Sequence, residues 1–168
     1  PFQVLVSYYF IAIAVSFGLL MLPWVHKEGI EVSALDTLFT AVSAVSVTGL
    51  TTINIAESFT TFGHIMILII LQFGAIGIMS VGTFVWLIVG KRIGMKERQL
   101  LMIDNNQNNL SGVVNLIREI VKILLLIELI GAILLSIHFK RYFETWEESI
   151  FNGIFTSISA TTNGGFDI

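Results

Sequence analysis

Three long apolar stretches stand out in the pattern of hydrophobic and polar positions. The first runs from Val4 to Leu22 and the second from Ile65 to Val89, and neither contains a charged residue. The third, Ile123 to Phe139, contains only Glu128 and can be lengthened by the aliphatic stem of Lys122. A helix needs about 20 residues, at about 1.5 Å each, to cross a hydrocarbon core. The pattern therefore predicts three membrane spans.

Two shorter apolar segments do not fit a span. Ala34 to Val45 and Ser149 to Ala160 are helix-like and rich in Ser and Thr, and glycine follows each within a few residues. Apolar runs of about 10 to 14 residues are typical of re-entrant or interfacial helices. An amphipathic surface helix is the alternative, but such a helix usually carries basic residues, which both segments lack. We expect both to be pore helices that enter the membrane and stop inside it.

An internal repeat connects these segments. A shift of 116 positions (155 minus 39) places the sequence FTAVSA, which begins at Phe39, on FTSISA, which begins at Phe155. The same shift aligns Gly49 with Gly165 and the first span with the third, without a gap. Such repeats indicate one structural unit used more than once, here a span, an outer loop, a short helix, a filter loop and a second span. We expect a first unit at residues 1–90, a linker at 91–116, and the front of a truncated second unit at 117–168.

Composition supports an all-α membrane protein. Hydrophobic residues make up 55% of the chain, charged residues make up 12%, and the mean hydropathy is +0.86. The chain has no cysteine and three scattered histidines, so the sequence offers no disulfide framework or recognisable zinc site. The net charge of −3 does not point to nucleic acid. We find no catalytic constellation, so we expect a protein that is not an enzyme.

Charge distribution predicts the orientation in the membrane. Most of the basic residues flank or lie in the linker, which by the positive-inside rule is cytoplasmic: Lys91, Arg92, Lys96, Arg98, Arg118 and Lys122. Most of the acidic residues fall in or near the outer loops. Both pore helices then enter from outside, where the acidic residues can concentrate cations over a screening length of about 8 Å.

The loops after the two short helices have the chemistry of a cation filter. The C-terminal end of each helix, which carries roughly −0.5 of a charge, is aimed at the membrane interior and attracts cations. Non-helical backbone at that depth must line a cavity or be buried in protein. A glycine at the aligned position permits positive φ, and the backbone carbonyls can then replace the hydration shell of a potassium ion. The predicted filter residues are Val47, Thr48, Gly49, Leu50, Asn163, Gly164, Gly165 and Phe166.

Three sequence motifs resemble the Trk/Ktr/HKT superfamily of potassium transporters, most closely the Ktr membrane subunit. They are SAVSVTGLTT at 43–52, NGGFD at 163–167 and GKRIGMKER at 90–98. The resemblance covers essentially the whole chain and implies four helix, pore helix, helix repeats around one pore. In that family a filter glycine marks potassium selectivity, and Gly49 and Gly165 both match it. Gly164 stands where the Ktr branch commonly has alanine, which leaves the fine geometry of the filter open.

The resemblance also implies the setting of the protein. It implies a multi-pass protein of a bacterial plasma membrane, embedded in the lipid bilayer as a homodimer of the full subunit. It further implies a cytosolic nucleotide-binding regulatory ring, for which the segment Lys91 to Arg98 and the polar stretch Asp104 to Asn109 are the candidate docking site. The alternative is that these basic residues only set the topology, because the positive-inside rule predicts them with or without a partner. Potassium is the transported ion, sodium is a possible coupling ion, and no cofactor is expected in this chain.

Two other functions remain open from the residues. A subunit of a homotetrameric potassium channel would also combine a pore helix with two spans, although a second filter loop in the same chain argues against it. A non-conducting membrane scaffold with vestigial loops is the other alternative. Glu128 and Gln72 lie inside the spans, and Glu128 is as compatible with an interhelical hydrogen bond as with the ion path. For Gly74, Gly77 and Gly82 we expect close packing between helices.

Overall fold

The computed structural model describes residues 2–77, 94–104 and 112–168. The elements in these ranges are helices, together with one isolated antiparallel bridge between His26 and Phe59. The helices are α1 (Phe2–Leu20), α2 (Ala34–Val45), α3 (Ile55–Ser58), α4 (Thr61–Ile76), α6 (Met95–Asp104), α7 (Val113–Phe139) and α8 (Trp146–Thr161). The all-α class predicted from the sequence is thereby confirmed.

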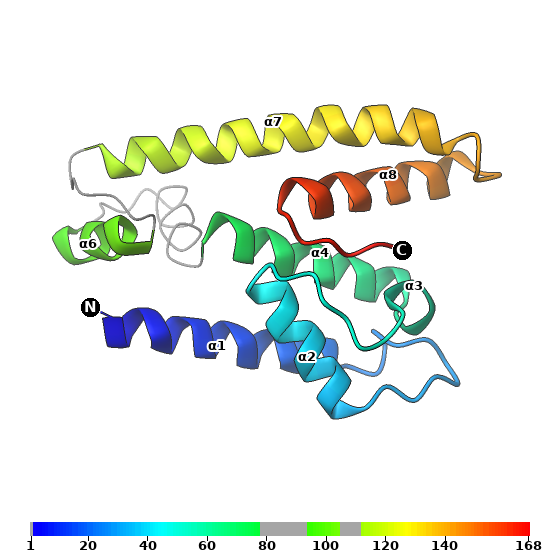
Figure 1. The fold of residues 1–168 in the computed structure, drawn as a ribbon, viewed down its shortest axis with the longest axis horizontal. Coiled ribbons are helices and arrows are strands. Elements are labelled where there is room, and N and C mark those ends of the chain that lie inside the picture. The colour runs from blue at the N-terminus through cyan, green and yellow to red at the C-terminus, as the bar shows by residue number, and fades with distance from the viewer. Residues whose placement is uncertain (1, 78–93, 105–111) are drawn as a thin grey trace.

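The helices α1, α4 and α7 run roughly along the long axis of the molecule, with α8 between α7 and α4 and with α2 oblique to α1 (Figure 1). The helix α2 contacts α1 and α4, while α8 contacts α7 and α4. Each of α2 and α8 therefore packs against the helix that precedes it in the chain, and α4 contacts both. This arrangement brings the C-terminal ends of α2 and α8 toward the middle of the molecule (Figure 1).

Polar side chains set the start of three of these helices. The hydroxyls of Ser33, Thr60 and Thr145 accept hydrogen bonds from backbone N–H groups in the first turns of α2, α4 and α8. These N-caps satisfy donors that would otherwise lack a partner at the helix start. The predicted helix Ala34–Val45 agrees with α2 at both ends. The predicted helix Ser149–Ala160 is too short, because the Thr145 cap starts α8 at Trp146.

The expected spans differ from the helices in their boundaries. The helix α1 ends at Leu20, before Pro23, and α7 begins at Val113, inside the segment expected to be linker. The stretch 65–89 is not one continuous helix, because α4 begins at Thr61 and ends at Ile76. Gly77 follows with a φ of 86°, which a right-handed helix cannot accommodate. Residues 78–93, with Gly82, Lys91 and Arg92, lie outside the described residues.

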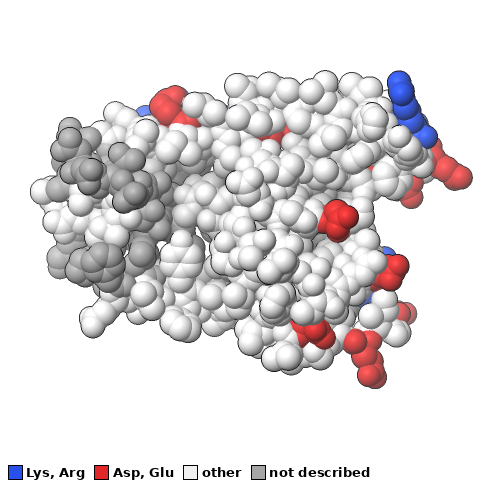
Figure 2. Space-filling model, viewed as in Figure 1, with Lys and Arg blue, Asp and Glu red and all other residues white. Residues whose placement is uncertain are grey.

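Hydropathy and charge fit a membrane environment. Within the described residues, Val114–Phe139 is a helix both long and apolar enough to cross a membrane. Three shorter helical segments are also apolar: Val6–Leu20, Ala34–Val45 and Thr61–Ile76. Figure 2 shows acidic side chains gathered at the end of the molecule where α8 begins, while the middle of this face is almost free of charge.

The buried core joins the two expected repeats. Leu20, Phe59 and Leu71 from the first repeat form one cluster with Phe155 and Phe166 from the second. Burial of apolar surface stabilises a fold by about 25 cal/mol per Å² when that surface is transferred out of water. Within a bilayer, helix association depends more on close van der Waals packing. The core therefore fixes the second loop against the first repeat.

Glycines allow the helices to approach closely. A Cβ on Gly153 of α8 would lie 2.7 Å from the backbone nitrogen of Ser136 on α7. A Cβ on Gly74 of α4 would lie 2.5 Å from the Val45 carbonyl oxygen at the end of α2. The close packing expected for Gly74 is confirmed, whereas Gly77 instead ends its helix.

Candidate cation filter

The loop after α2 contains two residues with positive φ. Ser46 caps the helix, Val47 has a φ of 52°, and Gly49 has a φ of 75°. Positive φ is unfavourable for a β-branched residue such as valine, and strain of this kind is concentrated at functional sites. The backbone of this loop is thus held by its surroundings in a conformation that the local sequence alone would not favour.

The loop after α8 has the same conformations at the aligned positions. Asn163 and Gly165 have φ values of 57° and 66°. The backbone N–H of Thr48 donates to the Ser43 carbonyl at 2.9 Å, and the aligned N–H of Gly164 donates to the Ser159 carbonyl at 2.7 Å. The equivalence inferred from the sequence therefore extends to backbone geometry at these loop positions.

The two loops meet at their glycines. A Cβ on Gly49 would overlap the carbonyl oxygen of Gly164 and would lie 3.2 Å from the Cα of Gly165. A Cβ on Gly165 would come no closer than 3.7 Å to Gly49. A side chain at position 49 is therefore disfavoured both by the positive φ and by the lack of space, whereas one at position 165 is disfavoured mainly by the positive φ.

A cavity of about 250 Å³ opens beside this contact. Its lining combines residues of both loops with the segment that leads into α3: Gly49, Thr51, Ile53, Asn54, Ile55, Gly165, Phe166 and Asp167. Backbone carbonyls, the hydroxyl of Thr51 and the carboxylate of Asp167 are oxygen ligands of the type that potassium prefers. Of the predicted filter residues, Gly49, Gly165 and Phe166 line this cavity, while Leu50 is 60% exposed.

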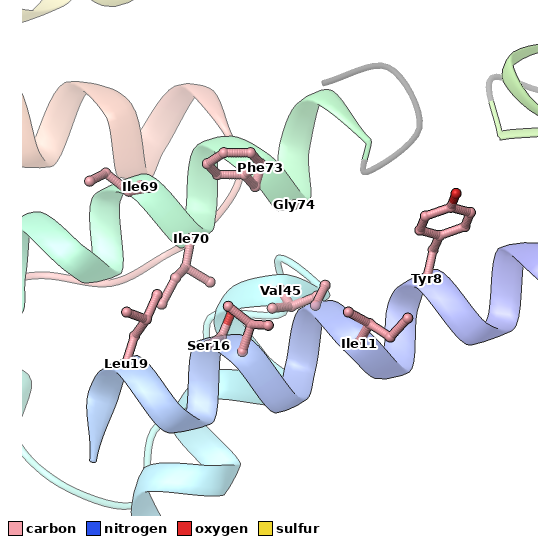
Figure 3. Close-up of a pocket in the computed structure, with 11 residues that line it drawn as sticks. Tyr8, Ile11, Ser16, Leu19, Val45, Ile69, Ile70, Phe73 and Gly74 are labelled. Atoms are coloured by element: carbon pink, nitrogen blue, oxygen red, sulfur yellow. The ribbon is translucent and has the colours of Figure 1, made fainter. Parts of the chain in front are cut away.

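A second hollow has different chemistry. A groove of about 350 Å³ lies between α1, the end of α2 and α4. Figure 3 shows its walls: Ile11 and Leu19 from α1, Val45 from α2, and Phe73 from α4. Apolar side chains cannot replace the hydration shell of an ion, so this groove lacks the chemistry of a cation site.

Two side-chain hydrogen bonds hold the segments that follow Gly49 and Gly165. The Thr52 hydroxyl donates to the Asp36 carboxylate at 2.6 Å, which connects the first loop to the start of α2. The Ser159 hydroxyl donates to the Phe166 carbonyl oxygen at 2.6 Å, which connects the second loop to the last turn of α8. Sequence reasoning did not identify Asp36, Thr52 or Ser159 as site residues. The repeat did align Ser159 with Ser43, which was the available signal.

Hydrogen bonds stabilise the charged form of Asp36. Ser33 donates to one carboxylate oxygen at 2.6 Å and Thr52 donates to the other. These two bonds, that from Ser33 first, lower the pKa of the Asp36 carboxyl below its ordinary value. Asp36 is therefore an ionised acceptor at neutral pH.

Glu128 joins the two repeats away from these loops. Its side chain is buried on α7, and one carboxyl oxygen accepts a hydrogen bond from the Gln72 amide on α4 at 2.9 Å. The Ser157 hydroxyl on α8 donates to the Glu128 backbone carbonyl at 2.8 Å. The second oxygen of Glu128 and the amide oxygen of Gln72 are buried without a partner among the described residues. The polar partner expected for Glu128 is thus Gln72.

A sequence model of the TrkH family, described as cation transport protein, matches residues 2–168 of the chain. The chain belongs to the TrkH family. The chain is 51% identical over its whole length to Ktr system potassium uptake protein D of Bacillus subtilis. It is 38% identical to Ktr system potassium uptake protein B of the same organism and 36% identical to the potassium/sodium uptake protein NtpJ of Enterococcus hirae. The chain spans 37% of the length of each of these three relatives.

Membership in the TrkH family identifies the chain as part of a membrane transport protein. The resemblance noted in the sequence is confirmed, and the all-helical fold agrees with it. Two of these relatives are named as components of a Ktr system, and the third is named for both potassium and sodium.

Proposed function

We propose that this chain forms the first filter repeat, and the front of the second, of a potassium uptake protein. The observation that carries the proposal is the meeting of two aligned glycine loops, at Gly49 and Gly165, beside a cavity with a mostly polar lining. The names of the relatives support potassium as the ion. Transport requires no bond to be made or broken, so the protein acts as a selective path and not as an enzyme.

The mechanism follows from the electrostatics of the two short helices. A potassium ion entering the cavity loses water and receives backbone carbonyls in exchange. The C-terminal ends of α2 and α8, each worth roughly −0.5 of a charge, lower the energy of the dehydrated cation. The acidic residues at the end of the molecule where α8 begins raise the local cation concentration before entry (Figure 2).

The proposed filter consists of two equivalent four-residue segments. Their members are Val47, Thr48, Gly49 and Leu50 in the first repeat, and Asn163, Gly164, Gly165 and Phe166 in the second. The shared φ signs at 47 and 163, and at 49 and 165, support this equivalence. The remaining carbonyls of the path come from two further repeats of the full-length protein.

Topology and partners complete the proposal. The chain crosses the membrane more than once, the linker at 91–116 is cytoplasmic, and both pore helices enter from outside. The full subunit forms a homodimer and binds a cytosolic nucleotide-binding ring. The names of two relatives, which refer to a Ktr system, support the presence of partner subunits. Sodium is a possible coupling ion because one relative is named for both cations.

A flux measurement with the full-length protein tests this function. The purified protein is reconstituted into liposomes, and uptake of radioactive potassium is followed with and without an excess of unlabelled potassium or sodium. We expect saturable uptake that unlabelled potassium suppresses more strongly than sodium. Liposomes that contain correctly inserted protein and take up no potassium would support a non-conducting scaffold instead.

A further inference from the structure

We propose that the two filter loops are held by different hydrogen bonds: an inner tether from Ser159 to Phe166 in the second loop and an outer tether between Thr52 and Asp36 in the first. These residues position the filter backbone and thereby set its selectivity. The inference rests on the proposed function, because the loops must form the filter for their tethers to affect selectivity.

The inner tether fixes the carbonyl that follows the second filter glycine. Ser159 is only 2% exposed, and its hydroxyl lies 2.6 Å from the Phe166 carbonyl oxygen. The Phe166 ring is itself buried in the core. Both the backbone and the side chain of this residue are therefore anchored, and the loop has little freedom to move relative to α8.

The equivalent serine of the first repeat makes no such bond. Ser43 aligns with Ser159 and is buried, yet its hydroxyl has no hydrogen-bond partner in the part of the chain that the structure describes. The backbone next to it is the same, since Thr48 bonds to the Ser43 carbonyl as Gly164 bonds to that of Ser159. The difference lies one residue past the glycine, where the Leu50 side chain is exposed while that of Phe166 is buried.

The outer tether holds the first loop by another route. The Thr52 hydroxyl lies 2.6 Å from one oxygen of Asp36, whose other oxygen accepts from Ser33. The positions that align with Asp36 and Thr52 are Asn152 and Ile168. Asn152 donates to the Glu148 carbonyl, and isoleucine has no hydrogen-bonding side chain. The outer tether is therefore specific to the first loop.

The tethers matter because a carbonyl site discriminates between ions only while its geometry is maintained. A loosened loop lets carbonyls move inward around a smaller ion such as sodium, so the preference for potassium falls. Loss of one intramolecular hydrogen bond corresponds to a change of about two- to tenfold in an equilibrium between loop conformations. We expect selectivity to change by that factor.

The test compares matched serine variants in the full-length transporter. The potassium to sodium uptake ratio is measured in liposomes for wild type, Ser159→Ala, Ser43→Ala and Ser159→Thr, with Gly165→Ser as a reference for the filter itself. We expect Ser159→Ala to lower the ratio about two- to tenfold. Ser43→Ala should leave the uptake ratio unchanged. Ser159→Thr, which keeps the hydroxyl, should largely preserve the wild-type ratio.

The outer tether has its own matched pair. Thr52→Val removes the donor with little change in shape and should lower the ratio, whereas Thr52→Ser should preserve it. Thr52 is exposed, so this pair remains informative if Ser159→Ala does not reach the membrane. Unchanged ratios in both Ser159→Ala and Thr52→Val would overturn the proposal, as would equal effects of Ser43→Ala and Ser159→Ala. If Gly165→Ser also leaves the ratio unchanged, the filter assignment itself is wrong.

Discussion

Gly49 lies against Gly164 so closely that a Cβ on Gly49 would overlap the Gly164 carbonyl oxygen. Gly164 is the residue before Gly165, which aligns with Gly49, so the first loop abuts the second at this point. Because the neighbouring atoms are backbone, no side-chain rotation can relieve that overlap. Gly49 and Gly165 are therefore equivalent in the sequence repeat and in conformation but not in their surroundings.

This asymmetry predicts unequal effects of alanine at the two glycines. Gly165→Ala must adopt positive φ, which costs about 1–2 kcal/mol, but it has room for the methyl group. Gly49→Ala has the same conformational cost and must also displace the second loop. We expect Gly49→Ala to reduce thermal stability and potassium uptake more than Gly165→Ala in the full-length protein. Equal losses in the two variants would contradict the described contact.

Glu128 should tolerate substitution by glutamine. Glu128→Gln keeps an oxygen that can accept from the Gln72 amide, and interhelical bonds of this kind contribute about 0.6 kcal/mol. Glu128→Leu leaves the Gln72 amide unpaired, which costs about 1–3 kcal/mol. We expect uptake to survive in the first variant and thermal stability to fall in the second. A Glu128→Gln protein that inserts normally and transports nothing would place Glu128 on the ion path.

The contact between α7 and α8 predicts which glycine-to-alanine substitution can be rescued by a second substitution in the facing helix. A Cβ on Gly131 would overlap only the Ser157 hydroxyl, with the next atom at 3.4 Å, whereas one on Gly153 would meet backbone atoms of Ser136. Gly131→Ala should therefore regain stability when combined with Ser157→Ala, and Gly153→Ala should not regain it with Ser136→Ala. Each misfit costs about 1–3 kcal/mol, measurable as a fall in melting temperature. Rescue of both pairs would show that the helix backbones can move apart.

The outer tether predicts a particular response to external pH. The pKa of Asp36 is lowered, so the carboxylate and its bond from Thr52 persist as the pH falls through the ordinary range near 4. The stabilisation is present above the unfolded pKa and is lost only when the pH drops through the lower folded pKa. The potassium to sodium ratio should therefore stay constant between external pH 7.5 and 5, as measured in liposomes. A midpoint near pH 6 that disappears in Asp36→Asn would contradict this.

Sequence periodicity located the helices α1, α2, α4, α7 and α8, although only α2 has the predicted bounds. The bounds of α2 followed from the apolar run Ala34 to Val45, and the alignment of Gly49 with Gly165 followed from the internal repeat, while the assignment of these glycines to a filter stays a prediction. The end of α4 could not be predicted in this way, because Gly77 lies in an unbroken apolar stretch and its positive φ is a property of the fold.

The sequence repeat could not predict the tertiary hydrogen bonds. Ser43 and Ser159 are identical residues at aligned positions, yet only Ser159 meets a carbonyl, because Phe166 is anchored in the core and Leu50 is not. The bond between Asp36 and Thr52 joins residues 16 positions apart across the filter loop and leaves no local signal. An alignment of repeats identifies equivalent positions, whereas packing decides which of their side chains meet.

The most direct test of the account is the potassium to sodium uptake ratio of the full-length transporter carrying Gly49→Ser. Gly18→Ser is the matched control, because Gly18 lies in α1 and a Cβ there would meet no described atom within 4 Å outside its own helix. The account predicts a clear fall in the ratio for Gly49→Ser, because a side chain there displaces the carbonyls that coordinate the ion, and no change for Gly18→Ser. An unchanged ratio in an abundant, correctly inserted Gly49→Ser protein would show that Gly49 is not part of the filter.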